Sequence, residues 1–316
     1  MRFSAGIDLG GTFTKLALVD SDGDLLDREK FPSLIGSPPR VLLRNARAAL
    51  EAMCARMHLP YPPTEGCGVG VPGVVDYASG TVRLSGAFGW TGVPLREIAE
   101  EVLGCRVAVD TDVNAGLLAD LHFGQASTAS EILYVSWGTG IGAGLAVART
   151  VYHSRNGAMG NFGHTLAKPN SSRRCYCGIS GCLEIEIGAR SLVQKAHIQI
   201  LQGKATLKSN ENVLTPELIA VAARAEDALA HEILREAVTL LARTLSASLA
   251  MLNPDVVVFA GGVSACLPLM RDVFDLELAR SVPAFTLANT TIGYSAFGES
   301  AGVVGAAKLA TLWRPK

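Results

Sequence analysis

Three cysteines and a histidine gather in the stretch 160–184, which contains His164, Cys175, Cys177 and Cys182. Three thiolates and one imidazole form a closed tetrahedral zinc set, which leaves no open position for water or substrate. Glycines inside the stretch permit the tight turn that returns the third thiolate to the first two. The spacing predicts a structural Zn²⁺ site. Clustered reduced cysteines or a disulfide pair are the alternatives.

A metal at this site would fix two further polar groups in place. If one ring nitrogen of His164 binds zinc, the other can donate a hydrogen bond outward. Glu184 follows Cys182 almost at once, so the metal would hold its backbone too. We therefore expect the loop 164–182 to present His164 and Glu184 to a ligand.

A glycine turn follows the first apolar run of the chain. Asp8 ends that run and is followed by Gly10, Gly11 and Thr12. Glycines let backbone N–H groups approach an anion, and the threonine adds a hydroxyl. The turn is not a Walker A loop, which requires a longer spacing and a lysine. A glycine hairpin without a ligand remains the alternative.

Two later glycine turns repeat this arrangement. Gly138, Thr139 and Gly140 follow an apolar strand and precede another, so the turn resembles the one near the N-terminus. Gly261 and Gly262 follow a third apolar strand, where bare backbone suits a nucleotide base or ribose. The repetition predicts a duplicated architecture with one phosphate loop in each half.

A cluster of polar side chains lies at a predicted junction between a strand and a helix. Asp110, Thr111, Asp112 and Asn114 follow the strand 107–109 and precede an apolar helical pattern. Such junctions are where α/β proteins place their chemistry. Either Asp112 or Asn114 could simply cap the helix, but two aspartates exceed what one cap requires.

Bulk properties bound the function of this chain. Its 316 residues suffice for two domains, and 49% hydrophobic with 18% charged residues is ordinary for a protein with a sizeable core. A net charge of −1 gives no support for non-specific nucleic-acid binding. The N-terminus lacks a secretory pattern, and no apolar run is long enough to span a membrane. With clustered thiols, this favours the cytoplasm.

Strand and helix patterns alternate along the chain. Pro216 after Thr215 predicts a capped helix start, and 202–214 reads as an exposed polar connection. Trp90 and the remaining cysteines are expected in apolar surroundings. Predicted strands cover 3–8, 14–20, 25–31, 66–71, 107–109, 132–137, the run ending at 147, and 255–259; predicted helices cover 38–58, 94–102, 189–201, 216–224, 226–252 and an amphipathic 300–312.

Taken together, these motifs resemble the ROK family (repressors, open reading frames, kinases), over almost the whole chain. Each motif alone is weak, but all of them in order are specific. They are D-L-G-G-T at 8–12, G-V-P-G at 70–73, G-T-G-I-G-A-G at 138–144, G-H at 163–164 with C-x-C-G-x-x-G-C-L-E at 175–184, and A-G-G at 260–262.

The resemblance implies an α/β, two-domain, actin-like ATPase (ribonuclease H-like) fold with a cleft. One domain would comprise 1–115 and about 300–316, and the other 116–299 with the zinc loop. It implies a sugar kinase in which ATP and Mg²⁺ lie between the glycine turns, Asp8 holds Mg²⁺ and Asp112 is the catalytic base. A homodimer or homotetramer is expected.

The same resemblance implies the substrate site, where the sequence departs from the family pattern. Thr111, Asn161, His164 and Glu184 would contact the sugar. Asn161 replaces the usual glutamate of G-E-x-G-H, and Thr111 replaces an asparagine. An amide donates as well as accepts, so we expect a substrate altered at the end remote from the phosphorylated hydroxyl.

Several substrates and one other function remain open at this point. Glucose, a modified or amino hexose, and a C7-cyclitol of the valiolone type are all candidate substrates. A sugar-binding regulator without catalysis is the other class, because some ROK members are repressors. Those members carry an N-terminal helix-turn-helix segment, for which a phosphate motif beginning at residue 8 leaves no room.

Overall fold

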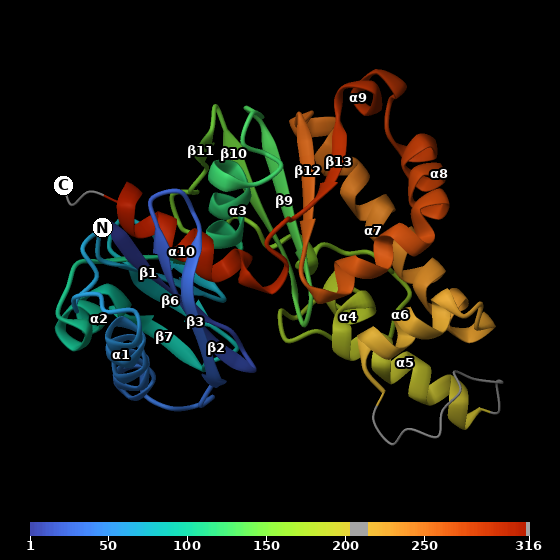
Figure 1. Ribbon diagram of the computed structural model, residues 1–316. Coiled ribbons are helices and arrows are strands. Elements are labelled where there is room, and N and C mark those ends of the chain that lie inside the picture. The colour runs from blue at the N-terminus through green and yellow to red at the C-terminus, as the bar shows by residue number, and fades with distance from the viewer. Residues whose placement is uncertain (203–213, 314–316) are drawn as a thin grey trace. The chain divides into compact units, whose positions relative to one another are not determined.

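The computed structural model describes residues 1–202 and 214–313, so the predicted connection 202–214 lies almost wholly outside the described residues (Figure 1). Contacts divide the chain into two compact units. The first unit comprises Met1–Tyr134, Gly144–Gly160 and Ser295–Lys316, and the second comprises Val135–Ala143 and Asn161–Tyr294. No helix in the described part of the chain has the length and apolar character needed to cross a bilayer.

The first unit is built on a five-stranded sheet with the order β3-β2-β1-β4-β8. β1 pairs antiparallel with β2, and β2 pairs antiparallel with β3, as expected for an opening meander. β1, β4 and β8 run parallel to one another. The strands are β1 (Phe3–Leu9), β2 (Phe13–Asp20), β3 (Leu25–Pro32), β4 (Cys67–Val71) and β8 (Val107–Thr111).

Helices cover both faces of this sheet. The large apolar side chains of β1 and β2 form one core with α1 (Pro39–Arg56) and α2 (Leu95–Leu103). The other face carries small residues and receives α10 (Ala301–Leu312), which also packs on α3 (Asp112–Phe123). Alternation of side chains along each strand explains why the two faces differ so sharply in residue size.

Glycines allow α10 to lie unusually close to the sheet. A Cβ on Gly6 would overlap the carbonyl oxygen of Val303, and one on Gly68 would overlap that of Ala306. A Cβ on Gly305 would overlap the carbonyl oxygen of Ala115 in α3. Neither sheet nor α3 could approach the α10 backbone this closely if these positions carried side chains.

A small antiparallel sheet completes the first unit. Its order is β5-β6-β7, formed by β5 (Val74–Asp76), β6 (Thr81–Ser85) and β7 (Trp90–Val93). The sequence prediction missed these three strands, because they are too short to show a clear alternation. Trp90 is buried, as expected, and its ring stacks on Phe88 with centroids 4.6 Å apart.

The second sheet has the order β11-β10-β9-β12-β13, and the division between the units passes through β9 and β10. Its strands are β9 (Ile132–Trp137), β10 (Ile141–Val147), β11 (Thr150–Val151), β12 (Val256–Ala260) and β13 (Thr291–Tyr294).

The second unit's α-helices are α4 (Leu183–Ile187), α5 (Ala189–Leu201), α6 (Pro216–Arg224), α7 (Ala228–Leu252), α8 (Arg271–Ser281) and α9 (Ala284–Asn289). It also contains the 3₁₀ helices η1 (Phe162–His164) and η2 (Gly262–Met270). A further 3₁₀ helix, η3 (Gly298–Ser300), precedes α10 in the first unit.

Two predictions differ from the structure in detail. α10 is not amphipathic, because eight of its twelve residues are buried where it packs on the sheet and on α3. The sequence division at 115/116 and near 299/300 also differs from the observed one. Residues 116–134, 144–160 and 295–299 belong to the first unit, since α3 packs along α10 rather than with the second unit's helices.

The contact between α10 and the sheet yields a stability prediction. Gly68→Ala should lower the free energy of unfolding by about 3 kcal/mol, because a methyl group there forces α10 away from β4. Gly104→Ala is the control: its site has open space but a φ of 70°, so only about 1 kcal/mol of backbone strain is expected. Urea unfolding measures both. Equal losses would contradict the close approach.

Candidate active site and metal site

Asp8, Gly70 and Asp110 form a row across three parallel strands. Asp8 of β1 is the register partner of Gly70 in β4, and Gly70 is the partner of Asp110 in β8. Parallel strands place their carboxyl ends at one edge of a sheet, so these residues mark the edge where α/β folds bind ligands. The predicted cluster after β8 therefore lies beside the first glycine turn, within the first unit.

Asp112 begins α3 directly above the central residue of this row. A Cβ on Gly70 would lie only 3.2 Å from the Cα of Asp112, so glycine there makes room for the helix start. The helix is capped by Thr111, whose Oγ1 accepts a hydrogen bond of 3.1 Å from the Asn114 amide. The alternative that Asp112 or Asn114 simply caps the helix does not hold, so the side chain of Asp112 does not serve as the N-cap.

Burial makes both carboxylates of this edge hard to ionise. Burial raises the pKa of Asp8 to about 7, and the negative charge of Asp112 adds to the effect. Burial likewise raises the pKa of Asp112 to about 6, although the Val113 amide donates to its Oδ1 over 2.9 Å. A cation or a proton-donating ligand beside them would offset this cost.

Asp110 forms hydrogen bonds with three residues around Asp112. It is 1% exposed and accepts hydrogen bonds from the Thr111 amide at 2.7 Å and from Asn114 Nδ2 at 2.9 Å. Its other oxygen lies 2.6 Å from His153 Nε2, and the His153 ring stacks on Tyr77 with centroids 4.0 Å apart. Sequence reasoning missed His153 and Tyr77, because tertiary structure alone brings them to β8.

The first glycine turn uses some of its own amides. Gly10 donates to the carbonyl oxygens of Asp8 and Phe13 at 3.1 Å each, so its amide is engaged within the turn. Ser33 supports the turn from β3's end, donating its Oγ to the Gly10 oxygen at 2.6 Å and its amide to the Thr12 oxygen at 2.9 Å. Gly11 and Thr12 are therefore the better candidates for phosphate contact.

The second glycine turn is joined to the loop that carries the cysteines. Glu184 Oε2 accepts a hydrogen bond of 2.8 Å from the Ile141 amide. A Cβ on Gly140 would lie 2.8 Å from the same oxygen, so a side chain at this position would displace the carboxylate from the Ile141 amide. The Gly138 carbonyl in turn accepts from the Ala189 amide at the start of α5. Gly138, Gly140 and Glu184 are thus brought together in the second unit.

The third glycine turn lies beside the second. Gly261 has a φ of 89°, and a Cβ there would lie 2.5 Å from the carbonyl oxygen of Trp137. A Cβ on Gly138 would lie 4.0 Å from the Gly262 amide nitrogen. The two turns that the sequence assigned to nucleotide binding therefore meet at the ends of β9 and β12.

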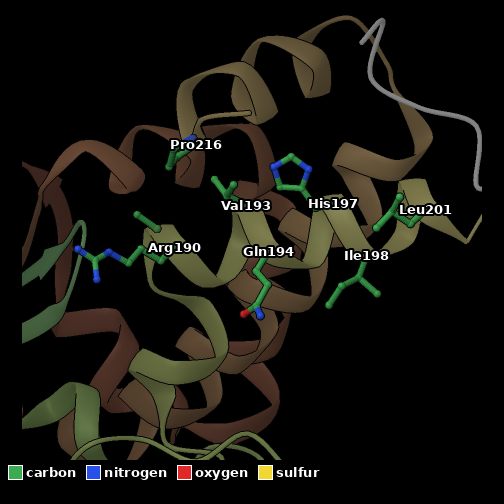
Figure 2. A pocket seen from close by; sticks show the side chains of 8 residues that line it. Arg190, Val193, Gln194, His197, Ile198, Leu201 and Pro216 are labelled. Carbon is green, nitrogen blue, oxygen red and sulfur yellow. The ribbon is translucent and has the colours of Figure 1, made fainter. Parts of the chain in front are cut away.

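An apolar groove runs along α5 and reaches Pro216 at the start of α6 (Figure 2). Its volume is about 400 Å³, and its walls are almost entirely apolar. Arg190 and Pro216 lie at the helix starts, while Val193, His197 and Leu201 line its length (Figure 2). Thr215 Oγ1 caps α6 by accepting from the Leu218 amide, as the sequence predicted. A flat aromatic ring suits such a slot.

The predicted metal ligands converge in the second unit. The ligand atoms of His164, Cys175, Cys177 and Cys182 all lie within 4.8 Å of one another. His164 Nδ1 is 3.8 Å from Cys175 Sγ and 4.0 Å from Cys182 Sγ. Zinc bond lengths in a tetrahedron imply ligand separations of about 3.7 Å, so the set fits Zn²⁺. All three cysteines are free thiols.

The remaining polar groups of this loop surround the histidine. Asn161 precedes η1, and its carbonyl oxygen accepts from the His164 amide at 2.9 Å. The Leu183 amide donates to the Thr165 oxygen, which joins the end of η1 to the start of α4 and hence to Glu184. Asn161 and His164 therefore lie at η1, and one backbone hydrogen bond connects the end of η1 to α4, which carries Glu184.

Comparisons with known proteins give this geometry a context. A family model described as ROK family matches residues 4–312. A glucokinase of Halalkalibacterium halodurans is 27% identical, with 96% of this chain and 93% of that protein covered. A putative xylose repressor of Caldicellulosiruptor sp. is 32% identical, with 88% of this chain and 69% of that protein covered.

A solved structure extends the comparison to the fold. It is the crystal structure of a ROK family glucokinase from Streptomyces griseus in complex with glucose and AMPPNP. Its TM-score is 0.81 at 26% identity, and the match covers 97% of this chain and 98% of that one. The chain described here has the same mixed α/β, two-domain, actin-like ATPase fold.

The raised pKa of Asp8 predicts a pH dependence of stability in protein freed of divalent metal. A carboxyl group whose pKa is higher in the folded state stabilises the fold at low pH, and this is lost as pH rises towards about 7. Asp8→Asn stays neutral, so its melting temperature should exceed that of the wild type by more at about pH 8 than at about pH 5.

The control for this measurement is Asp22→Asn, which changes an exposed aspartate in the turn after β2. Its difference from the wild type should be the same at both pH values. If the Asp8→Asn difference were also independent of pH, the raised pKa of the carboxyl group at the end of β1 would be contradicted.

Proposed function

Because this chain belongs to the ROK family, we propose that it is an ATP-dependent kinase that phosphorylates a primary hydroxyl of a sugar or sugar-like polyol. The observation that carries the proposal is the half-buried Asp112 at the start of α3, whose pKa is raised, which lies beside Asp8 and does not cap the helix. A neutral hydroxyl needs such a base to attack a phosphate.

Each half of the proposed nucleotide site has its own residues. In the first unit, Gly11 and Thr12 would contact phosphate, and Asp8 would hold Mg²⁺ directly or through water. In the second unit, Gly138, Thr139 and Gly140 would contact phosphate, and Gly261 and Gly262 would lie against the ribose. Bound Mg²⁺ would supply charge neutralisation for the transferred phosphoryl group.

The apolar groove along α5 would take the adenine ring. It begins at Ala189, whose amide binds the Gly138 carbonyl, and Glu217 Oε1 lies near Gly262 at the other helix start. An aromatic base gains from burial in an apolar slot, and the polar helix starts would meet its sugar and phosphates. This arrangement joins the groove to both glycine turns.

The sugar would be held by the loop that carries the metal site. Glu184 would contact its hydroxyls, with Asn161 nearby on η1 and Thr111 in the first unit. The Cys₃His set would hold Zn²⁺ as a structural ion, since four protein ligands leave no site for water. These ligands require reduced thiols, which supports the cytoplasm as the compartment.

The substrate itself is the finer part of the proposal. Hexoses are supported by the names of the glucokinase relatives. Asn161 supports a substrate altered at the far end, such as a modified or amino hexose or a C7-cyclitol. An assay of ADP release with MgATP and glucose, mannose, fructose, N-acetylated hexosamines, kanosamine and valiolone-type cyclitols would distinguish them.

A sugar-responsive regulator is the second candidate, and the similarity to a putative xylose repressor favours it. A regulator needs the sugar site but not a base. Desolvation raises the pKa values of Asp8 and Asp112, so their ionised forms cost stability in a ligand-free fold near neutral pH, and a catalytic role would account for that cost. Sugar binding without any ADP release would favour the regulator.

Asp112→Asn should lower kcat by about 10²–10⁴-fold, because the amide cannot accept the hydroxyl proton. In the wild type, kcat/KM should fall below about pH 6, where Asp112 becomes protonated. The control is Asp272→Asn, which alters an exposed aspartate in the first turn of α8. Near wild-type turnover in Asp112→Asn would contradict the assignment of Asp112 as the catalytic base.

Elemental analysis tests the metal. Protein purified without chelator should contain one zinc ion per chain, and Cys177→Ser should lose it, because the set then has three strong ligands. Sugar affinity should fall more than ATP affinity, since the sugar-binding groups lie on this loop. Cys54→Ala, a buried cysteine in α1, should retain zinc. Wild type without zinc would refute the site.

A further inference from the structure

Tyr176 lies between two of the metal ligands, and its hydroxyl covers the outward nitrogen of the third. Tyr176 Oη is 2.9 Å from His164 Nε2, and the two rings meet edge to face with centroids 5.1 Å apart. Tyr176 is 78% exposed, so its ring stands at the surface of the loop. The sequence predicted a His164 nitrogen that donates directly outward, and the structure places a phenol there instead.

The orientation of His164 fixes the direction of this hydrogen bond. Its Nδ1 faces the sulfur atoms of Cys175 and Cys182, so Nδ1 is the atom that would bind the metal. A neutral imidazole that binds metal through Nδ1 carries its proton on Nε2. Nε2–H therefore donates to Tyr176 Oη. A phenol that accepts in this way still has its own proton to donate.

We propose that Tyr176 is a specificity-determining residue, whose hydroxyl donates a hydrogen bond to a carbonyl-type oxygen at the end of the sugar remote from the phosphorylated hydroxyl. The inference rests on the proposed function, because it requires that the sugar bind at this loop. The Tyr176 hydroxyl takes the place of His164 Nε2–H as the outermost hydrogen-bond donor and lies further out from the metal site. The site then fits a substrate whose acceptor stands away from the ring, as in an N-acylated sugar.

The neighbouring groups agree with this direction of donation. Asn161 lies one turn of η1 from His164 and carries an amide, which donates, where a carboxylate would only accept. The join between Thr165 and Leu183 keeps Glu184 at the same end of the loop, where it can accept from sugar hydroxyls. The exposed ring of Tyr176 also offers an aromatic face to the C–H groups of a sugar.

Calorimetric titration of the zinc-loaded protein tests the inference without requiring turnover. The probes are N-acetylglucosamine and N-acetylmannosamine, with glucose and mannose as the matched sugars lacking the acyl carbonyl. Tyr176→Phe removes only the hydroxyl and should weaken binding of the acylated sugars by about 3–10-fold, as for one neutral hydrogen bond. Binding of glucose and mannose should change less than twofold.

Two further variants sharpen the result. Tyr152→Phe, an exposed tyrosine in the first unit, should bind every probe as the wild type does. Tyr176→Ala uncovers His164 and should reverse the preference towards the unacylated sugars. Zinc content and the Kd for ADP should be unchanged in all three variants, which separates a substrate contact from a role in holding the metal loop.

The outcomes separate this inference from the proposed function. Equal binding of all sugars by Tyr176→Phe and wild type would overturn the inference, whereas sugar binding without ADP release would overturn only the kinase. Loss of zinc from Tyr176→Phe would assign the phenol to the metal site and also overturn the inference. The inference would also be overturned if the wild type bound neither N-acetylglucosamine nor N-acetylmannosamine.

Discussion

The parallel register of β1, β4 and β8 is the constraint on which the first unit's site depends. It sets Asp8, Gly70 and Asp110 in one row at the carboxyl edge of the sheet. Because Gly70 has no side chain, α3 can begin directly over the row and bring Asp112 next to Asp8. A shift of one residue between β4 and β8 would replace Gly70 with a valine and exclude the helix start. The geometry of the proposed catalytic site therefore depends on the register of the strands.

The same principle, an absent side chain that lets polar groups meet, recurs in the second unit. Gly140 lets Glu184 reach the Ile141 amide, and Gly261 lets the β12 turn lie on Trp137. Each contact joins segments that are far apart in the sequence. The glycine motifs thus determine how closely neighbouring elements approach, in addition to the phosphate contacts that we propose for their amides.

Local chemistry was predictable from the sequence, and tertiary contacts were not. The residue types and spacing of the cysteines and His164 indicate a metal site, and the structure brings their ligand atoms together. Thr111 was assigned to substrate, although its hydroxyl caps α3. His153 and Tyr176 gave no signal, because a lone histidine and a tyrosine between cysteines acquire meaning only from what they contact. The prediction that 300–312 forms an amphipathic helix was wrong, because α10 is packed on more than one side and therefore has no single apolar face.

Reaction type and substrate choice rest on residues with very different physical constraints. Asp8 and Asp112 sit in a low-dielectric edge where their charges are costly, so a change there alters both stability and chemistry. Tyr176 is 78% exposed and its ring meets His164 edge to face, so we expect its replacement to disturb no core. In the proposed kinase, substitutions at the surface of the metal loop would therefore change which sugar is bound without changing the reaction. On that argument, Asn161 and Tyr176 would determine specificity, while Asp8 and Asp112 would serve phosphoryl transfer.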